Sequence, residues 1–337
     1  MLVAMLLLSV PAQAQQVTIH NITPQTDASF RGLSVVDDSV AWVSGSKGWV
    51  GRSNDGGRQW SYTQVKGYEK SEFRSLHAFD AQHAIIASTS TPAAILTTAD
   101  GGHTWQKVYE TIDTAIFFDG IDFCDSKHGV IYGDPVNGRM VLMSTTDGGQ
   151  TWKDMPVGSR PLLSEGEASF AASGTCIKYT APHELIIATG GTASRLLVTA
   201  NGGKRWRYIS TPILQGQSTT GIFSFLRLSK THWLIAGGDY KRDTLSTANL
   251  FYTRNAGKTW QAPAVTTRGY RECLAAVGNN TLLAAGPTGI YISNDNGNTW
   301  QPLSDEKQSH VVKKARNGSL VVVAGGRGNI AVISISR

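Results

Sequence analysis

The sequence predicts an all-β fold, a seven-bladed β-propeller, from the form of a repeat, its spacing and its composition. A short phrase built on Asp or Asn, Gly and Trp recurs six times in the 337 residues, with its tryptophans at positions 60, 105, 152, 206, 260 and 300. Successive copies lie 40 to 54 residues apart, close to the roughly 40–50 residues of a four-stranded propeller blade. The 36 glycines and the short apolar runs suit many strands joined by tight turns.

The repeated phrase has the form Ser/Thr-x-Asp/Asn-x-Gly-x-Thr-Trp and resembles the Asp-box of sialidase-like β-propellers. We expect each box to connect the third and fourth strands of its blade. The Asp or Asn accepts backbone hydrogen bonds, the glycine takes a positive φ, and the tryptophan packs between blades. Because equivalent copies recur in six blades, we expect a structural and not a catalytic role for their acidic or amide residues, Asp55, Asp100, Asp147, Asn201, Asn255 and Asp295.

The seventh blade is predicted to be completed by the N-terminal part of the chain. Residues 320–325 and 329–334 repeat the strand pair that precedes each box, but no box or fourth strand follows them. Residues 17–22 alternate apolar and polar side chains, as a half-buried strand does. We therefore expect this segment to form the outer strand of the last blade and to close the ring without a covalent link.

The first 14 residues are predicted to be a cleavable secretory signal. Residues 2–10 form a short apolar run that ends at Ala12-Gln13-Ala14, although no Lys or Arg precedes it. Cleavage is expected after Ala14, which leaves residues 15–337 as a single propeller domain. No other segment is apolar for long enough to span a membrane. We expect a periplasmic or secreted protein that is a monomer.

The composition limits the classes of partner and cofactor. The net charge is +6, but 31 Lys and Arg and 25 Asp and Glu are spread along the chain. This favours a protein partner or an acidic small molecule or glycan over nucleic acid. Cys124, Cys176 and Cys273 are interpreted as small buried side chains, with a Cys124–Cys176 disulfide as the alternative. Neither metal-ligand spacing nor a phosphate-binding or dinucleotide motif is present, so no metal or cofactor is expected.

Candidate functional residues come from a second repeat at the start of the innermost strands. The phrase beginning Phe30-Arg31-Gly32-Leu33 is matched by Phe73-Arg74-Ser75-Leu76 and by Phe118-Asp119-Gly120-Ile121. Blades six and seven offer Arg271 and His310, and a loop over residues 164–170 carries a further carboxylate. The predicted binding set around one funnel is Arg31, Arg74, Asp119, Glu167 and Arg271.

Two interpretations of this set remain open. Arginines gathered in a funnel suit recognition of a carboxylate or phosphate, because guanidinium groups bind such groups with two hydrogen bonds. Alternatively, these arginines pair with Asp119, Glu167 and Glu272 and satisfy a polar axis lined by water. Nearby, residues 134–139 are expected to form a turn in blade three, and residues 239–243 begin an insertion in blade five that is a candidate specificity loop.

With the boxes and the Phe30–Leu33 phrase, the chain resembles the photosystem II stability/assembly factor family of seven-bladed propellers. The resemblance runs from Val17 to Arg337 and includes Phe118–Phe123 and the repeated Thr-x-Asp-Gly-Gly-x-Thr-Trp. It implies an exported, non-enzymatic scaffold that holds client proteins without a cofactor, with arginines on the propeller surface implicated in binding. Matching the family's motif residue by residue assigns this binding role to Arg31, Arg74 and Arg271. The resemblance does not imply a photosynthetic host.

The alternative function is a sialidase-like glycoside hydrolase acting on an acidic glycan. In that case Arg31, Arg74 and Arg271 would imitate the three arginines that hold the substrate carboxylate. The nucleophile would be Tyr270 or Glu272 and the acid Asp119, although the Arg-Ile-Pro phrase of sialidases is absent. Three arginines that converge on one point would favour the enzyme, and arginines that are each paired with a carboxylate would favour the scaffold.

Overall fold

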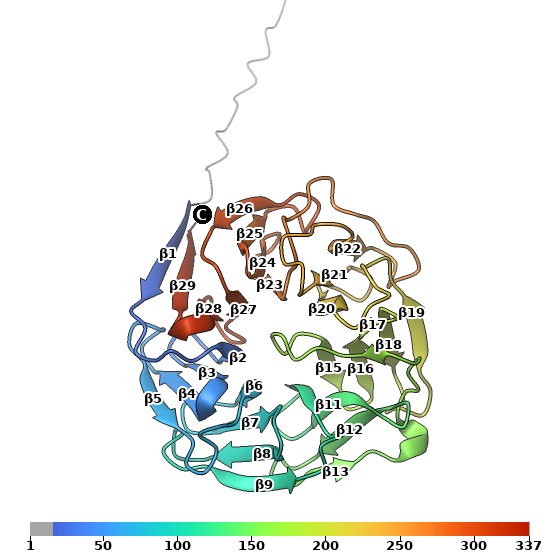
Figure 1. Ribbon diagram of the computed structural model, residues 1–337. Helices are drawn as coiled ribbons and strands as arrows, with labels where there is room; N and C mark the ends of the chain where they lie inside the picture. Colours follow the sequence, from blue (N-terminus) through green and yellow to red (C-terminus); the bar gives the residue numbers. More distant parts are fainter. Residues whose placement is uncertain (1–15, 337) are drawn as a thin grey trace, which may run out of the picture.

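Seven antiparallel sheets are arranged as blades around a central axis in the computed structural model, which describes residues 16–336 (Figure 1). The prediction of an all-β, seven-bladed propeller is therefore confirmed. The expected signal segment, residues 1–14, lies outside the described residues. Between residues 16 and 336, no helix combines the length and the apolar character that crossing a membrane requires.

Blades one to three are four-stranded meanders whose first strand is innermost. Blade one contains β2 (Phe30–Val35), β3 (Ala41–Gly45), β4 (Trp49–Ser53) and β5 (Ser61–Gln64). Blade two contains β6 (Phe73–Ala78), β7 (Ala84–Ser88), β8 (Ala93–Thr98) and β9 (Gln106–Thr111). Blade three contains β10 (Phe118–Phe123), β11 (Gly129–Val136), β12 (Arg139–Thr145) and β13 (Lys153–Asp154), with the expected turn between β11 and β12.

Blades four to six follow the same plan with one variation. Blade four contains β15 (Ile177–Ala181), β16 (Glu184–Ala188), β18 (Arg195–Thr199) and β19 (Arg207–Ser210). Blade five contains β20 (Thr220–Arg227), β21 (Trp233–Asp239) and β22 (Leu250–Thr253), and it is extended by β17 (Gly190–Gly191) and β14 (Glu167–Ala168). Blade six contains β23 (Cys273–Ala276), β24 (Leu282–Gly286), β25 (Gly289–Ser293) and β26 (Gln301–Ser304). Short 3-10 helices occur at η1 (Ser46–Gly48), η2 (Val157–Ser159) and η3 (Gly326–Gly328).

Blade seven joins the two ends of the chain. It contains β27 (Ser309–Lys314), β28 (Val321–Gly325) and β29 (Ile330–Ser336), and β1 (Gln16–Ile22) is its outer strand. Strand β1 pairs antiparallel with β29 from Gln16 opposite Ser336 to Ile22 opposite Ile330. The predicted closure of the last blade by the N-terminal strand is therefore confirmed.

Each box is a hydrogen-bonded loop, as the box of blade three shows. Asp147 accepts hydrogen bonds at one carboxylate oxygen from Thr145 Oγ1 (2.7 Å) and Thr151 N (3.0 Å), and at the other from Thr151 Oγ1 (2.6 Å). Gly149 has a φ of 88° and donates its N–H to Thr145 Oγ1 at 3.0 Å. The Trp152 indole donates to the Gly149 carbonyl at 3.0 Å. Every polar group of Asp147 is occupied by its own loop, which supports the structural interpretation of the box.

The boxes lie on the face of the ring opposite the starts of the innermost strands. In the box of blade three, the N–H of Gly148 donates to the carbonyl of Lys127, which lies in the loop between the first two strands of that blade. In blade two, the N–H of Gly101 donates to the carbonyl of Gln82 in the corresponding loop. In an antiparallel meander this loop and the box are on the same side of the sheet. We call this side the box face, and the side where the innermost strands start the funnel face.

The core consists of apolar side chains from neighbouring blades that face one another. One cluster brings together Leu33 and Val43 of blade one, Leu283 of blade six and Val322 of blade seven. The box tryptophans are unequal in burial: Trp60, Trp152 and Trp300 are buried, whereas Trp105, Trp206 and Trp260 are half-buried. All three cysteines of the described chain are free thiols, so the alternative Cys124–Cys176 disulfide is not formed.

We expect Trp152→Ala to lower the free energy of unfolding by about 3–5 kcal/mol, because it removes a buried aromatic ring. Trp152 is 9% exposed and its indole nitrogen has a hydrogen-bond partner. Trp260→Ala is the matched control, since Trp260 is half-buried and its indole nitrogen has no partner. Urea unfolding followed by far-ultraviolet circular dichroism compares the two, and an equal loss in both variants would contradict this ranking.

Candidate functional site

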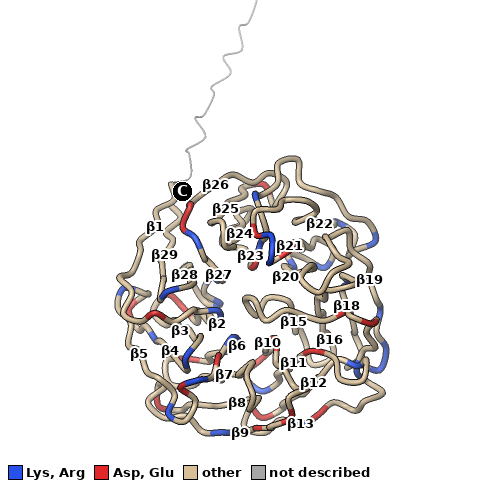
Figure 2. The backbone as a smooth tube through the Cα atoms, in the orientation of Figure 1, with Lys and Arg blue, Asp and Glu red and all other residues tan. Residues whose placement is uncertain are grey.

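The funnel face contains a cavity of about 870 Å³ around the propeller axis. Arg31 and Arg74, at equivalent positions near the starts of β2 and β6, line it together with Asp119 of β10. Glu272, directly before β23, and His310 of β27 also line it, as do the charged residues Asp27, Asp134, Asp243 and Arg327. Figure 2 shows that charged residues are otherwise distributed around the ring, with no single-sign tract. The repeat register therefore places Arg31, Arg74 and Asp119 around one opening, as expected.

A loop of the chain extends into the centre of the ring on this face. It spans residues 169–176, between β14 and β15, and we call it the axial loop (Figure 1). Its first part lines the funnel cavity, and its last part, Gly174 and Thr175, lines a separate cavity that faces the box side. The axial loop thus lies between the two cavities.

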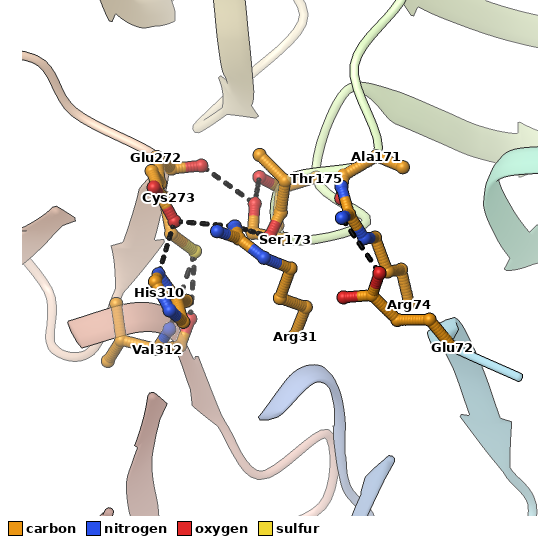
Figure 3. A network of polar contacts seen from close by, with 11 residues as sticks. Arg31, Glu72, Arg74, Ala171, Ser173, Thr175, Glu272, Cys273, His310 and Val312 are labelled. Atoms are coloured by element: carbon orange, nitrogen blue, oxygen red, sulfur yellow. Dashed lines mark hydrogen bonds and ion pairs between the residues drawn. The ribbon is translucent and has the colours of Figure 1, made fainter. Parts of the chain in front are cut away.

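The axial loop is held by a buried carboxylate, that of Glu272, and by the groups bound to it. Glu272 Oε2 accepts hydrogen bonds from Arg31 Nη1 at 2.9 Å and lies 2.8 Å from His310 Nδ1 (Figure 3). Arg31 Nη1 also donates to the Ala172 carbonyl at 3.0 Å, and Ser173 Oγ donates to the Glu272 carbonyl at 2.7 Å. Burial alone would raise the pKa of Glu272, but the Arg31 charge and the hydrogen bonds from His310 and Arg31 outweigh it and lower the pKa.

Arg74 is paired in the same manner on the other side of the axial loop. Its Nη2 contacts Glu72 Oε2 at 2.9 Å, and its Nη1 lies 3.5 Å from the Ala171 carbonyl (Figure 3). Each funnel arginine therefore binds one carboxylate and one carbonyl of the axial loop. The arginines are thus paired with carboxylates, as in the second interpretation, but of the three expected partners only Glu272 pairs with one of them, and Arg74 pairs with Glu72.

Asp119 differs, because its carboxyl group is buried without a partner. Neither carboxylate oxygen has a hydrogen bond within the described chain, and the residue is 1% exposed. Burial, and then repulsion from Asp134, raise the pKa of Asp119 well above its ordinary value, and the Arg74 charge only partly opposes them. Burial therefore favours the protonated form of the Asp119 carboxyl.

Aromatic rings form the remaining part of the funnel wall. Phe170 of the axial loop stacks on Phe223 with ring centroids 3.9 Å apart, and Tyr270 meets Phe223 edge-on at 4.5 Å. Tyr240, at the start of the blade-five insertion, packs edge-on against Phe170 and Phe223 and keeps 47% of its surface exposed. The funnel thus combines paired charges with an exposed aromatic surface.

Two residues of the predicted binding set do not reach the funnel. Arg271 is fully buried and donates to the carbonyls of Gly289 and Arg268, each at 2.7 Å, so it braces a loop of blade six. Glu167 is 1% exposed and forms a two-pronged ion pair with Arg195, with one contact of 2.9 Å. The sequence placed both residues near the rim, but the direction of each side chain is set by these local partners.

The three arginines proposed to imitate a sialidase therefore do not converge. Arg31 and Arg74 bind different carboxylates, and Arg271 faces away from the cavity. Glu272, one candidate nucleophile, is occupied by Arg31 and His310, and Tyr270, the other, is 2% exposed with its pKa raised by burial. Among residues 16–336 there is no group of three His, Cys, Asp or Glu residues arranged to hold a metal ion.

Several contributors to the site were not identified from the sequence. Glu72 stands two residues before Arg74, and this spacing could have suggested their ion pair. Phe223 lies in a buried strand whose sequence resembles any core strand. The carbonyls of Ala171 and Ala172 are backbone groups, which leave no signal in the sequence.

Comparison with known proteins gives similar propellers. The sequence pattern of the family described as "Photosynthesis system II assembly factor YCF48" matches residues 12–112. A relative named "Photosystem II assembly lipoprotein Ycf48", from Synechococcus sp. (strain CC9902), is 21% identical over 313 residues, which are 91% of this chain and 85% of the relative. The resemblance to photosystem II assembly factor-like propellers is confirmed.

Solved structures match the fold over nearly the whole chain. The structure titled "YCF48 bound to D1 peptide" has a TM-score of 0.65 and 16% identity, and covers 96% of this chain and 99% of its own. A GH74 xyloglucanase from Xanthomonas campestris has a TM-score of 0.61 and 15% identity, and covers 94% of this chain but 53% of its own. At these identities both structures support the propeller fold alone.

We expect Glu272→Gln to reduce stability by about 3–5 kcal/mol near neutral pH, since it leaves Arg31 without its carboxylate. Because the folded-state pKa of Glu272 is lowered, its contribution is present above the ordinary carboxyl pKa and is lost as pH falls through the folded-state value. Urea unfolding at pH 7 and pH 3 should therefore show a large difference from the wild type that shrinks in acid. Exposed Glu165→Gln is the control, and wild-type stability of Glu272→Gln at pH 7 would refute the assignment.

We expect Asp119→Asn to change the free energy of unfolding in the opposite direction to Glu272→Gln, that is, to stabilise the protein as the pH rises. The raised folded-state pKa of Asp119 means that the wild type loses stability as pH rises above the carboxyl's ordinary 3.8, by about 1.4 kcal/mol for each unit of elevation. The variant cannot ionise there, so it should be more stable than the wild type at pH 8 and similar at pH 4. Chemical unfolding at both pH values measures the difference, and a pH-independent one would show that Asp119 does not titrate as described.

Proposed function

We propose that this photosystem II assembly factor-like propeller is an exported, non-enzymatic scaffold that binds an extended segment of a client protein in its funnel. The observation that carries the proposal is the combination of paired arginines with an exposed aromatic surface around one cavity. Arg31 and Arg74 are already neutralised by Glu272 and Glu72. Tyr240 remains open to a ligand, with 47% of its surface exposed.

A polypeptide segment suits this wall better than a small anion does. Rigid aromatic side chains such as Tyr240 provide large contact areas at little entropic cost, and they dominate many protein interfaces. The partly exposed guanidinium groups of Arg31 and Arg74 can then donate hydrogen bonds to backbone carbonyls or acidic side chains of the segment. An acidic group on the client is compatible with the net charge of +6.

The comparisons support the same class of function. One similar structure is described as bound to a D1 peptide. We propose a peptide-binding role for this chain as well, without assigning D1 as its client. The relative named as a lipoprotein, together with the apolar N-terminal segment ending at Ala14, supports export. We propose that residues 1–14 are removed and that residues 15–337 act as one domain.

The glycosidase alternative has less support in the geometry. A retaining glycosidase needs two carboxyl-type groups placed across the scissile bond, one of them free to act as nucleophile. Glu272 is engaged by Arg31 and His310, and Asp119 is buried without a positioned partner. The similarity to the xyloglucanase concerns the propeller fold, which hosts unrelated functions.

Selection from a random peptide library displayed on phage, followed by affinity measurement of the enriched peptides, tests the proposal. We expect Tyr240→Ala to weaken binding about tenfold, equivalent to 1.4 kcal/mol. Tyr208→Ala is the matched control, because Tyr208 has a similar 39% exposure but lies on β19 at the outside of blade four.

Two results would contradict the proposal. The first is a set of enriched peptides whose affinity is unaffected by Tyr240→Ala but reduced by Tyr208→Ala. The second is turnover of any chromogenic glycoside by the wild type that is lost in Glu272→Gln while that variant remains folded.

A further inference from the structure

The box face has its own cavity at the axis, separate from the funnel. Its volume is about 480 Å³, and its walls come from the later parts of the innermost strands. Five Lys or Arg residues line it, against a single carboxylate, Asp122. The cationic residues are Lys178, Arg227, Lys313, Lys314 and Arg316.

Two of these cations have acidic neighbours at the outer edge of the cavity. Arg227 lies 3.6 Å from Glu184 and also donates to the Ser229 carbonyl. Lys314 is close enough to Asp38 to help lower the pKa of that carboxyl, although the backbone hydrogen bonds from Leu320 and Ser319 contribute more. The unbalanced charge is therefore concentrated on the remaining three cations.

The inner three cations, Lys178, Lys313 and Arg316, share one carboxylate. Asp122 lies 3.7 Å from Lys178 Nζ, and the same carboxylate oxygen already accepts a hydrogen bond from Tyr179 N at 2.8 Å. Arg316 donates to Ser34 Oγ at 3.0 Å and to a backbone carbonyl, both neutral groups. Asp37 also acts electrostatically on Arg316 but does not line the cavity, so among the lining residues these three cations face a single carboxylate, that of Asp122.

Lys313 is the least satisfied member of the group. It is half-buried on β27, and among the described residues its ammonium has no hydrogen-bond or ion-pair partner. Burial lowers its pKa, and the neighbouring Arg316 and Lys178 lower it further, against the opposing effect of Asp122. His77, on the same wall, has its pKa lowered well below the ordinary value by burial and then by Arg316, Lys313 and Lys178. The lowered pKa values of Lys313 and His77 thus reflect burial and the positive charges gathered in this confined space.

From this arrangement we propose that the box-face cavity is a binding site for a small multivalent anion bearing phosphate or carboxylate groups, held by Lys313, Lys178 and Arg316. An anion with two or more charges would balance the local excess and give Lys313 the partner that it lacks. The volume of about 480 Å³ accommodates a compact small molecule. This site is distinct from the funnel, because the axial loop lies between them.

Isothermal titration calorimetry of the protein with inorganic pyrophosphate and, separately, with citrate tests the proposal. It also distinguishes a phosphate ligand from a carboxylate ligand. We expect at least one of the two anions to bind and Lys313→Gln to weaken that binding about tenfold, because a desolvated charge pair is lost. Lys153→Gln, on the outer strand β13, is the control and should bind as the wild type does.

The melting temperature separates a ligand-binding role from a structural one. In the absence of ligand, Lys313→Gln should melt at the same or a higher temperature than the wild type, because the substitution relieves repulsion from Arg316 and Lys178. The proposal is overturned if neither anion binds at millimolar concentration, if Lys313→Gln binds as tightly as the wild type, or if only an acidic peptide binds.

Discussion

The carboxylate of Glu272 is the contact on which the centre of the molecule depends. It precedes the innermost strand of blade six, binds Arg31 of blade one and contacts His310 of blade seven, so that one buried anion joins three consecutive blades. Through Arg31 the carboxylate also holds the axial loop, and Ser173 Oγ of that loop donates to the Glu272 backbone carbonyl. Burying a carboxylate is costly unless cations and donors surround it, and these partners cannot be moved independently. The position of the axial loop, and with it the separation of the two axial cavities, depends on this network together with the Arg74–Glu72 pair.

The fold was predictable because its determinants are local and repeated. The Asp or Asn of each box accepts hydrogen bonds from groups within four residues, as Asp147 does from Thr145 and Thr151, so the same sequence gives the same loop in each blade. The alternating pattern of residues 17–22 was sufficient to identify the closing strand, since a half-buried edge strand requires that period. The register of the boxes also placed Arg31, Arg74 and Asp119 around one opening.

The directions and partners of the site residues were less predictable, because they depend on which backbone and side-chain groups the fold brings within reach. Arg271 and Arg74 both precede or begin innermost strands, yet one turns into blade six and the other toward the axial loop. That difference is decided by which carbonyls lie within reach, and backbone carbonyls have no sequence signature. Likewise, Glu167 pairs with Arg195, 28 residues away, through a strand pairing between blades that no repeat encodes.

The seam between β1 and β29 has a consequence for how the molecule assembles. Ser336 donates to the carbonyl of Gln16, a contact between residues 320 positions apart, so the ring is completed only when almost the whole chain is present. Contacts of such long range form slowly, and until they form β29 is an unpaired edge strand. A second copy can offer its own β1 to that edge with the same register and the same hydrogen bonds. We therefore expect closure within one chain to compete with strand exchange between chains, with exchange favoured at higher protein concentration during folding.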